Sequence, residues 1–321
     1  MKFFAHSVVV LLLTSSLQAQ GGSEIVDSLQ IGRLPGGDSD TVAVPKLRLY
    51  DPVKVGTASL VIPGLGQVYT QHYVKAFFFI GIEVLFGSMA YFWNQSAAVQ
   101  EETTAQYLAK AQSDVASGFS TKDSAEDFEL SRFSHYSAIN NRFSGYNFLT
   151  WTIGAHIYNT LDAIDASNYF KNERERNPGT AFLLAAIPGL GLGQIYNGAW
   201  SKAGLVIMGQ WSLGMMAFNN QRLMVQAENN FERLNTPLTD STANSIRSQV
   251  AEDLSASWAS ARYTAFSNRN MFMWYSIFFY GYSIFDAVVD AYLHDYPEKM
   301  QIKPDLAVGT KSIEFSLQTK F

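Results

Sequence analysis

The sequence predicts an all-α integral membrane protein made of two tandem repeats and a short strand-like tail. Three observations predict it: a composition poor in charge, two apolar stretches long enough to cross a bilayer, and one block of sequence that occurs twice. Charged residues make up 16% of the chain, and Phe, Tyr and Trp together make up 14%. Because soluble proteins have about 25% charged residues, this composition favours a membrane environment.

The first 19 residues have the pattern of a secretory signal peptide. Lys2 precedes an apolar run from Val8 to Leu13, and Ala19 is a suitable last residue before cleavage. The run is much shorter than the roughly 20 residues that a membrane helix needs. An uncleaved anchor is the alternative. Residues 20–56, rich in Gly, Asp, Ser and Pro, are expected to form a flexible linker.

Composition also excludes several classes of function. The chain has no Cys, which excludes disulfides and Cys-ligated zinc, and export without Cys fits a bacterial envelope protein. The net charge of -5 includes no basic patch, which excludes nucleic acid as a partner. The His residues show no metal-ligand spacing and no catalytic signature occurs, so we expect no enzyme, cofactor or metal site.

Two stretches, residues 74–93 and 271–290, have the length and apolar composition of membrane-spanning helices. Residues 203–218 form a shorter apolar stretch. Residues 147–166 would not qualify on hydropathy alone.

The repeat extends the prediction to all four stretches. Gln67, Tyr69 and Lys75 recur 127 positions later as Gln194, Tyr196 and Lys202, and the same offset carries Arg142 onto Arg269. A three-residue deletion then brings Tyr158 and Asp162 onto Tyr282 and Asp286. We therefore expect two copies of one membrane unit, residues 57–166 and 180–291.

Each copy is expected to contain a short re-entrant segment and two long helices that form a hairpin. The polar stretches 94–146 and 219–270 each contain turn residues, "SGFSTKDS" and "NTPLTDSTANS". We expect these stretches to protrude from the bilayer as helical hairpins that bind other envelope proteins. A loosely structured polar loop is the alternative.

The remaining segments are a linker and a tail. Residues 167–179 are expected to link the copies. Residues 292–321 form the tail, in which "SIEFSLQTKF" alternates apolar and polar residues as a strand does.

A Pro-Gly break opens each copy. Pro cannot continue an upstream helix, and Gly permits backbone angles that other residues avoid. A broken backbone at membrane depth needs buried acceptors for its N–H groups. The residues of this motif are Pro63, Gly64, Gly66, Gln67 and Tyr69 in the first copy, and Pro188, Gly189, Gly191, Gly193, Gln194 and Tyr196 in the second.

Polar residues within the apolar stretches are the other candidates. Tyr and Asp are one turn apart in "Y-x-x-x-D-A", so Asp162 and Asp286 are expected to accept hydrogen bonds from the loop N–H groups. The full set is Glu83, Gln210, Tyr158, Asp162, Asp165, Tyr282, Asp286 and Asp290.

These acids support two interpretations. Carboxylates in membrane helices and broken helices in repeated halves both occur at transport sites. However, Asp165, Asp286 and Asp290 lie at helix ends, where an acid is less costly and can cap a loop, which favours a structural role. Glu83 lies in mid-span, and its counterpart is Gln210.

The motifs resemble a known family. "IPGLGQVY" and "PGLGLGQIYNGAWSKAG" are similar to the PGLGQIYN loop of a membrane-protein family of Gram-negative envelopes, a domain of unknown function. "FDAVVDAYLHDY", residues 285–296, resembles its DAxVDAxL helix end. The second copy is the better match, because the first lacks Asn-Gly after Tyr69 and has "LDAIDA". The resemblance implies a membrane protein and no activity.

The sequence thus predicts a non-enzymatic membrane protein of the bacterial envelope with a structural or interaction role. Its expected partners are the lipid bilayer and, through the hairpins, other envelope proteins. The alternative is a small-solute or ion transporter or channel that uses Glu83, Gln210, Asp162 and Asp286. Helical spans favour the inner membrane over the outer one, with the N-terminus exported.

Overall fold

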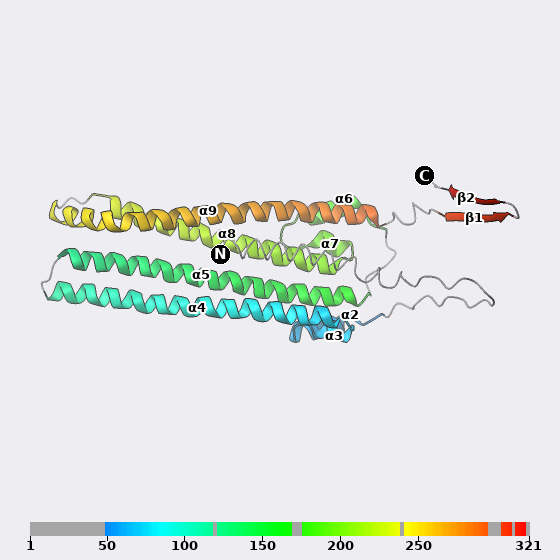
Figure 1. Ribbon diagram of the computed structural model, residues 1–321, viewed down its shortest axis with the longest axis horizontal. Helices are drawn as coiled ribbons and strands as arrows, with labels where there is room; N and C mark the ends of the chain where they lie inside the picture. Colours follow the sequence, from blue (N-terminus) through cyan, green and yellow to red (C-terminus); the bar gives the residue numbers. More distant parts are fainter. Residues whose placement is uncertain are drawn as a thin grey trace. The chain divides into compact units, whose positions relative to one another are not determined.

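A computed structural model describes residues 49–117, 121–168, 175–237, 241–294, 303–309 and 312–318. The predicted signal peptide and residues 20–48 of the predicted linker lie outside the described residues. The elements, in chain order, are α2 (Pro52–Val61), α3 (Leu65–Tyr69), α4 (Tyr73–Ala116), α5 (Thr121–Ala166), α6 (Pro178–Ala185), α7 (Leu192–Tyr196), α8 (Trp200–Asn235), α9 (Ser241–Leu293), β1 (Lys303–Gly309) and β2 (Ser312–Gln318) (Figure 1).

Four long helices lie side by side. α4 packs along α5, α8 packs along α9, and α5 also packs on α8 and, over a smaller area, on α9 (Figure 1). Ion pairs fix the directions: Lys75 meets Asp162 at one end of α4 and α5, and Lys110 meets Asp127 at the other. Because Arg233 of α8 also pairs with Glu129 of α5, the α4–α5 and α8–α9 turns lie at the same end.

The prediction that the polar stretches 94–146 and 219–270 are helical is confirmed for the described residues. α4 continues from its apolar part to Ala116, and α8 continues to Asn235 without a break. The 44 residues of α4 span about 66 Å at about 1.5 Å per residue. That is about twice the thickness of a hydrocarbon core of about 30 Å. A loosely structured polar loop is therefore wrong for the described residues.

The short helices begin earlier than the predicted repeats. The Asp51 side chain accepts hydrogen bonds from the N–H groups of Val53 and Lys54, and Pro52 occupies the first turn of α2. Asn177 caps α6 in the same way, ahead of Pro178. An Asx-Pro cap therefore precedes both α2 and α6. α2 begins five residues before residue 57, and α6 begins two residues before residue 180.

Two helices, Tyr73–Ala116 and the part of α9 from Leu254 to Leu293, are long and apolar enough to cross a membrane. Only 22% and 17% of their most apolar windows are buried inside the protein. The core helix of a soluble protein would be buried on most of its surface. These apolar surfaces are instead turned outward.

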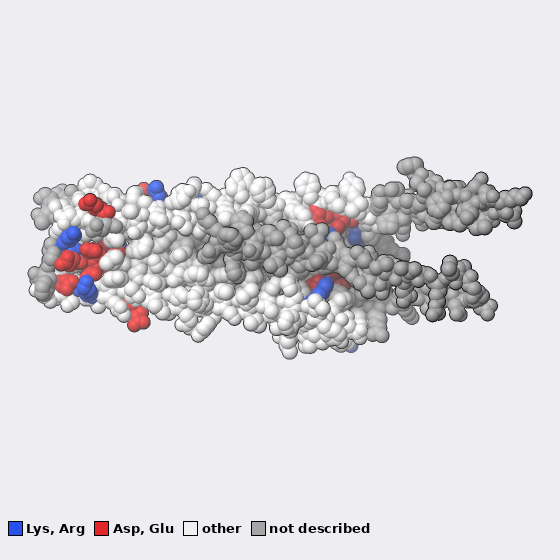
Figure 2. Space-filling view, viewed as in Figure 1, with Lys and Arg blue, Asp and Glu red and all other residues white. Residues whose placement is uncertain are grey.

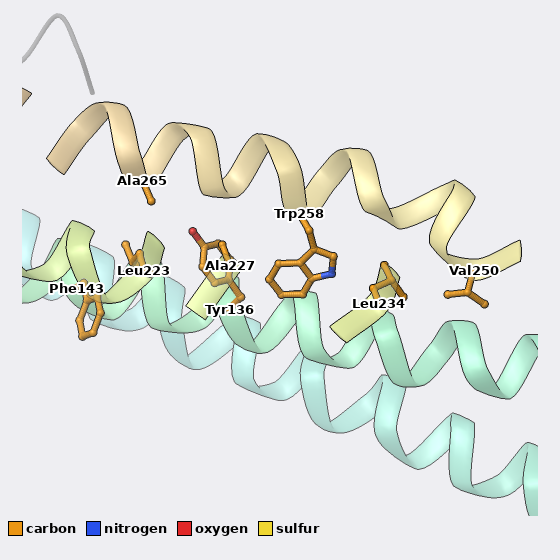
Figure 3. Close-up of a cluster of buried hydrophobic side chains, with 8 residues drawn as sticks. All are labelled: Tyr136, Phe143, Leu223, Ala227, Leu234, Val250, Trp258 and Ala265. Carbon is orange, nitrogen blue, oxygen red and sulfur yellow. The ribbon is translucent and has the colours of Figure 1, made fainter. Parts of the chain in front are cut away.

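The half of the bundle nearest the turns has an ordinary hydrophobic core. Its largest side chain, Trp258 of α9, is fully buried and meets the ring of Tyr136 edge to face (Figure 3). It meets the ring of Phe133 in the same way. Burial raises the pKa of Tyr136 to about 12. The core residues are Tyr136, Phe143, Leu223, Ala227, Leu234, Val250, Trp258 and Ala265.

The tail contains a two-stranded antiparallel ribbon. β1 and β2 pair with Val308 opposite Ile313 and Lys303 opposite Gln318. α9 itself continues to Leu293, two residues into the predicted tail.

Truncation in this core tests the packing. Leu223→Ala is expected to lower the free energy of unfolding by about 3 kcal/mol, because it removes a buried side chain and leaves a cavity. Val225→Ala, at an exposed position of the same helix, should change it by less than about 0.5 kcal/mol. Thermal and denaturant unfolding of the detergent-solubilised protein measure both. Equal effects would contradict the packing described.

Candidate functional site

A left-handed glycine leads into each of the two shortest helices. Gly64 precedes α3 with φ 78°, and Gly191 precedes α7 with φ 58°. The equivalent segments are therefore "LGQVY" and "LGQIY", each after a left-handed Gly. Pro63 and Pro188 are not equivalent, because the second loop has additional residues before Gly191. Within that longer loop Gly189 also has a positive φ, and its carbonyl accepts from the indole N–H of Trp211 at 2.9 Å.

The glycine inside each short helix, Gly66 in α3 and Gly193 in α7, is needed because a larger residue has no room there. A Cβ on Gly66 would lie 2.5 Å from Ser59 Oγ and 2.8 Å from Ala163 Cβ. On Gly193 it would lie 2.7 Å from Ala185 Cβ and 2.8 Å from Ala287 Cβ. In the first half of the protein, α2 to α5, the short helix α3 thus packs tightly between α2 and α5. In the second half, α6 to α9, the short helix α7 packs tightly between α6 and α9.

A fully buried glutamine follows each of these glycines. Gln67 Nε2 donates to the carbonyl of Asn159 at 2.8 Å, and Gln194 Nε2 donates to the carbonyl of Ser283 at 2.7 Å. The same nitrogens lie 3.3 Å from Asp162 Oδ2 and 3.5 Å from Asp286 Oδ2. Each amide therefore joins a short helix to the backbone and to an acid of the long helix beside it.

The loop N–H groups do not use the predicted acceptors. Gly64 N–H donates to Asn159 Oδ1 at 3.2 Å, and Gly66 N–H donates to Ser59 Oγ at 2.9 Å. The expectation that Asp162 accepts from these loop N–H groups is wrong. In the second half, Asp286 accepts from the side chains of Gln194 and Lys202. A neutral amide and a hydroxyl are sufficient acceptors in the first loop, and the acids bind a stronger donor.

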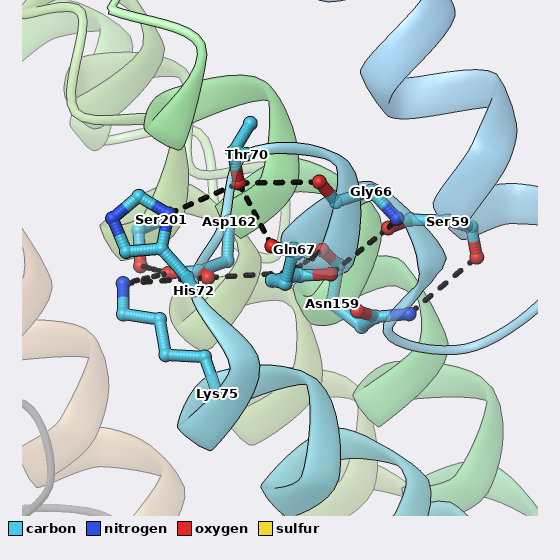
Figure 4. A network of polar contacts seen from close by, with 9 residues as sticks. All are labelled: Ser59, Gly66, Gln67, Thr70, His72, Lys75, Asn159, Asp162 and Ser201. Carbon is cyan, nitrogen blue, oxygen red and sulfur yellow. Dashed lines mark hydrogen bonds and ion pairs between the residues drawn. The ribbon is translucent and has the colours of Figure 1, made fainter.

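That donor is a lysine. Lys75 Nζ lies 3.0 Å from Asp162 Oδ1, and Ser201 Oγ of the other half donates to the same oxygen at 2.8 Å (Figure 4). Asp162 is buried, whereas the Lys75 side chain is partly exposed. The pair therefore holds α4 against α5 at one end of the bundle, and Ser201 adds α8.

The second half repeats this arrangement with one more acid. Lys202 Nζ lies 2.9 Å from Asp286 Oδ1 and 2.7 Å from Asp290 Oδ2. Asp165 is not the counterpart of Asp290, because the three-residue shift places Ala166 there. Asp165 lies almost one turn beyond Asp162 in α5 and is half-buried.

The paired tyrosines differ between the halves. The Tyr158 ring meets the Phe79 ring edge to face, and its backbone lies against Gly204 of α8. Tyr282, in contrast, is about half exposed.

The motif tyrosines, Tyr69 and Tyr196, are the last residues of the short helices α3 and α7. Tyr196 Oη accepts from the N–H of Asn177, and the Tyr69 ring packs on Tyr50. Both residues therefore link the end of the motif to the beginning of its unit.

Glu83 and Gln210 lie apart from these networks. Glu83 Oε2 is 3.0 Å from Nδ1 of His156, whose Nε2 lies 2.9 Å from the carbonyl oxygen of Leu60. Gln210 Nε2 donates weakly to Ser283 Oγ, at 3.4 Å.

The seam between the halves is made of small and amide side chains. Gly154 and Gly204 let α5 and α8 approach closely, since a Cβ on either would lie 2.8 Å from an atom of the other helix. Asn219 Nδ2 donates to the buried Asn147 Oδ1 at 2.8 Å. Close glycine contacts and interhelical amide bonds are typical of helix packing in membranes.

Sequence reasoning missed the cations and most acceptors of the networks. Lys75 and Lys202 were visible as repeated residues, but nothing indicated which acid each would meet. Asn159 and Ser201 had no signal, because their roles depend on contacts across 39 to 100 residues of chain. Ser59 accepts from Gly66, seven residues away, and no pattern in the sequence marked it. Among the described residues, no group of three His, Cys, Asp or Glu could hold a metal ion.

Asp162→Asn tests the first network. It should lower the free energy of unfolding by more than the roughly 1 kcal/mol of an exposed pair and less than the roughly 3–5 kcal/mol of a fully buried one. The reason is that Lys75 loses its counter-ion but keeps partial access to solvent. Adding Lys75→Gln should restore part of the loss in a double-mutant cycle. Lys54→Ala, at an exposed residue, is the control; additive effects of the two network changes would refute the pairing.

Gly66→Ala tests the close packing of α3. The added methyl group has no room and is expected to lower the free energy of unfolding by about 1–3 kcal/mol. Gly87→Ala is the matched control, because a Cβ there meets no atom within 4 Å. It should be neutral or slightly stabilising. Melting temperatures that fall equally in both variants would show that space around Gly66 is not limiting.

Comparison with known proteins finds a family match for the second half of the chain. No curated protein and no solved structure matches the chain. Residues 174–321, which contain α6 to α9 and both strands, match the model of a family of unknown function (DUF5683).

Proposed function

We propose that the protein is a non-enzymatic integral membrane protein of the bacterial envelope with a structural or interaction role. The observation that carries this proposal is a band across the four long helices that is almost free of charge and is bounded at both ends by polar contacts between helices.

The band is defined by the sequence of each helix. Lys, Arg, Asp and Glu do not occur in residues 143–161 of α5, 203–221 of α8 and 270–285 of α9, and residues 76–100 of α4 contain only Glu83. At about 1.5 Å per residue these segments are roughly 24–38 Å long. A hydrocarbon core is about 30 Å thick.

The two edges of the band are in register between the helices. At one edge Lys75, Asp162 and Ser201 meet, and Lys202 meets Asp286. The other edge contains three contacts: Glu101 with Arg142, Arg222 over the Phe143 ring, and Arg269 with Gln221. A common level on all four helices is what a bilayer requires.

Large apolar side chains cover the outside of the band. Phe77 is 80% exposed and Phe278 is 69% exposed. Tyr91, Phe92, Trp211, Phe218 and Trp274 are also exposed. Apolar surface on this scale is typical of contact with lipid.

Beyond the band the bundle has the surface of a soluble protein. Ion pairs such as Lys110–Asp127 and Arg262–Glu228 lie there, and Figure 2 shows charged side chains gathered at the hairpin end and again beside the short helices. An open groove of about 540 Å³ between α5, α8 and α9 has no charged residue in its lining. We propose that these hairpins, residues 94–146 and 219–270, bind other envelope proteins.

Equivalent contacts support two copies of one unit. Each half has an Asx-Pro cap, a left-handed Gly, a buried Gln on a carbonyl and a Lys–Asp pair, in the same order. In these contacts the halves run in parallel, with both hairpin turns at one end. The alternative, an ion or solute transporter, loses the support that inverted repeats would give.

The resemblance of the motifs supports membership of the Gram-negative envelope family, and the match of the second half to a family of unknown function is consistent with it. Helical spans and the N-terminal pattern favour the inner membrane with an exported N-terminus.

Single-Cys labelling in intact cells and in inverted membrane vesicles tests the proposal, because the chain has no Cys. Ser113→Cys and Ser245→Cys, near the two hairpin turns, should label with an impermeant thiol reagent from the same side of the membrane. Phe77→Cys and Phe278→Cys, within the band, should label only after detergent is added. Labelling of the band positions in intact membranes would refute membrane insertion, and opposite labelling of the turns would favour the transporter.

A further inference from the structure

Two ionisable side chains, Glu83 and His156, lie inside the band and contact each other. Glu83 on α4 is 11% exposed and its Oε2 is 3.0 Å from His156 Nδ1 on α5. Glu83 Oε1 is buried and has no hydrogen-bond partner among the described residues. The next charged residues along these helices, Lys75 and Asp162, already pair with each other.

The other nitrogen of the imidazole fixes where its protons are. Nε2 of His156 lies 2.9 Å from the Leu60 carbonyl oxygen at the end of α2. A carbonyl can only accept, so Nε2 carries a hydrogen. A neutral imidazole then has no hydrogen on Nδ1, and an ionised carboxylate has none either. The contact between Nδ1 and Oε2 therefore contains a further proton, held by one group or the other.

The second half shows the same position without an ionisable pair. The offsets of the repeat place Gln210 at Glu83 and Tyr280 at His156. Tyr280 donates to the Ala186 carbonyl at 2.7 Å, as His156 does to Leu60. The contact to the short helix is thus made in both halves, but only the first half can bind or release a proton there.

The surroundings keep the pair neutral. On α5 the charged residue nearest to His156 is Asp162, six residues away. On α2 the charged residue nearest to Leu60 is Lys54, also six residues away. On α4 the charged residue nearest to Glu83 is Lys75, eight residues away. Tyr158 also lies close on α5, as a phenol that is neutral at about pH 7. A lone carboxylate at this depth would have no cation to pair with and would be costly to keep.

We propose that Glu83 and His156 together bind one exchangeable proton within the membrane band. This inference rests on the proposed placement of the band in the membrane. The bound proton closes the contact between α4 and α5 and leaves His156 able to hold α2. When it is released, two acceptors face each other at 3.0 Å and the contact opens. The site gives the protein a means of responding to, or carrying, a proton.

Imidazole nitrogen NMR of protein labelled with ¹⁵N-histidine tests the proton directly. Spectra are recorded in detergent from about pH 5 to about pH 9, around the ordinary pKa of His, and the His156 signal is assigned by its loss in His156→Gln. Infrared difference spectra of wild type minus Glu83→Gln report the protonated carboxyl. We expect hydrogen on Nε2 throughout, together with either an imidazolium or a protonated Glu83 at about pH 7.

Two variants make the result decisive. In Glu83→Gln the amide donates to Nδ1, so His156 should stay neutral over the whole range. Glu83→Gln with His156→Tyr copies the second half and should keep the wild-type melting temperature with one titrating proton fewer. Glu101→Gln, at the partly exposed acid that pairs with Arg142, is the control and should leave the His156 signal unchanged.

An ionised Glu83 beside a neutral His156 at about pH 7 would overturn the proposal. So would the same His156 titration in Glu83→Gln as in the wild type. Because these spectra report protonation in detergent, they can fail while Cys labelling still places the band in the membrane, and the reverse also holds.

Discussion

The buried amide of Gln67, and that of Gln194 in the second half, is the contact on which the rest of the arrangement depends. Each amide ties a five-residue helix to a backbone carbonyl of a 46- or 53-residue helix. Helices of five residues are not stable alone, since helix formation has a costly nucleus. The amide bond and the glycine contacts hold these segments in place, and the segments in turn close the end of each helix pair near the Lys–Asp pairs.

Local rules were enough to predict the elements. The helical stretches and the positions where they end follow from apolar length and turn residues. The Pro-Gly motif also indicated a break at the correct place. Its geometry was less accessible, because the loop before α7 is longer than the loop before α3. The glycines equivalent to Gly64 and Gly66 are Gly191 and Gly193, whereas the prolines have no common position.

Side-chain partners across the bundle were not predictable from the sequence. Asp162 was expected to cap a loop and instead binds Lys75 and Ser201, which come from two other helices. The choice depends on competition between donors, and an ammonium group is a stronger partner for a carboxylate than a backbone N–H. Such competition is decided only once the helices are placed side by side. The Glu83–His156 contact is a similar case, since the two residues are 73 positions apart.

The central position of α5 has a consequence for biosynthesis. Among the described elements it is the one long helix that packs on all three others, and α4 packs on α5 but not on α8 or α9. During translation α4 and α5 are complete before α8 is made. In that interval Asn147 and the oxygen of Asp162 that later accepts from Ser201 lack their partners from α8. The first hairpin, α4 and α5, therefore has polar groups without their α8 partners until the second hairpin is made and packs against α5.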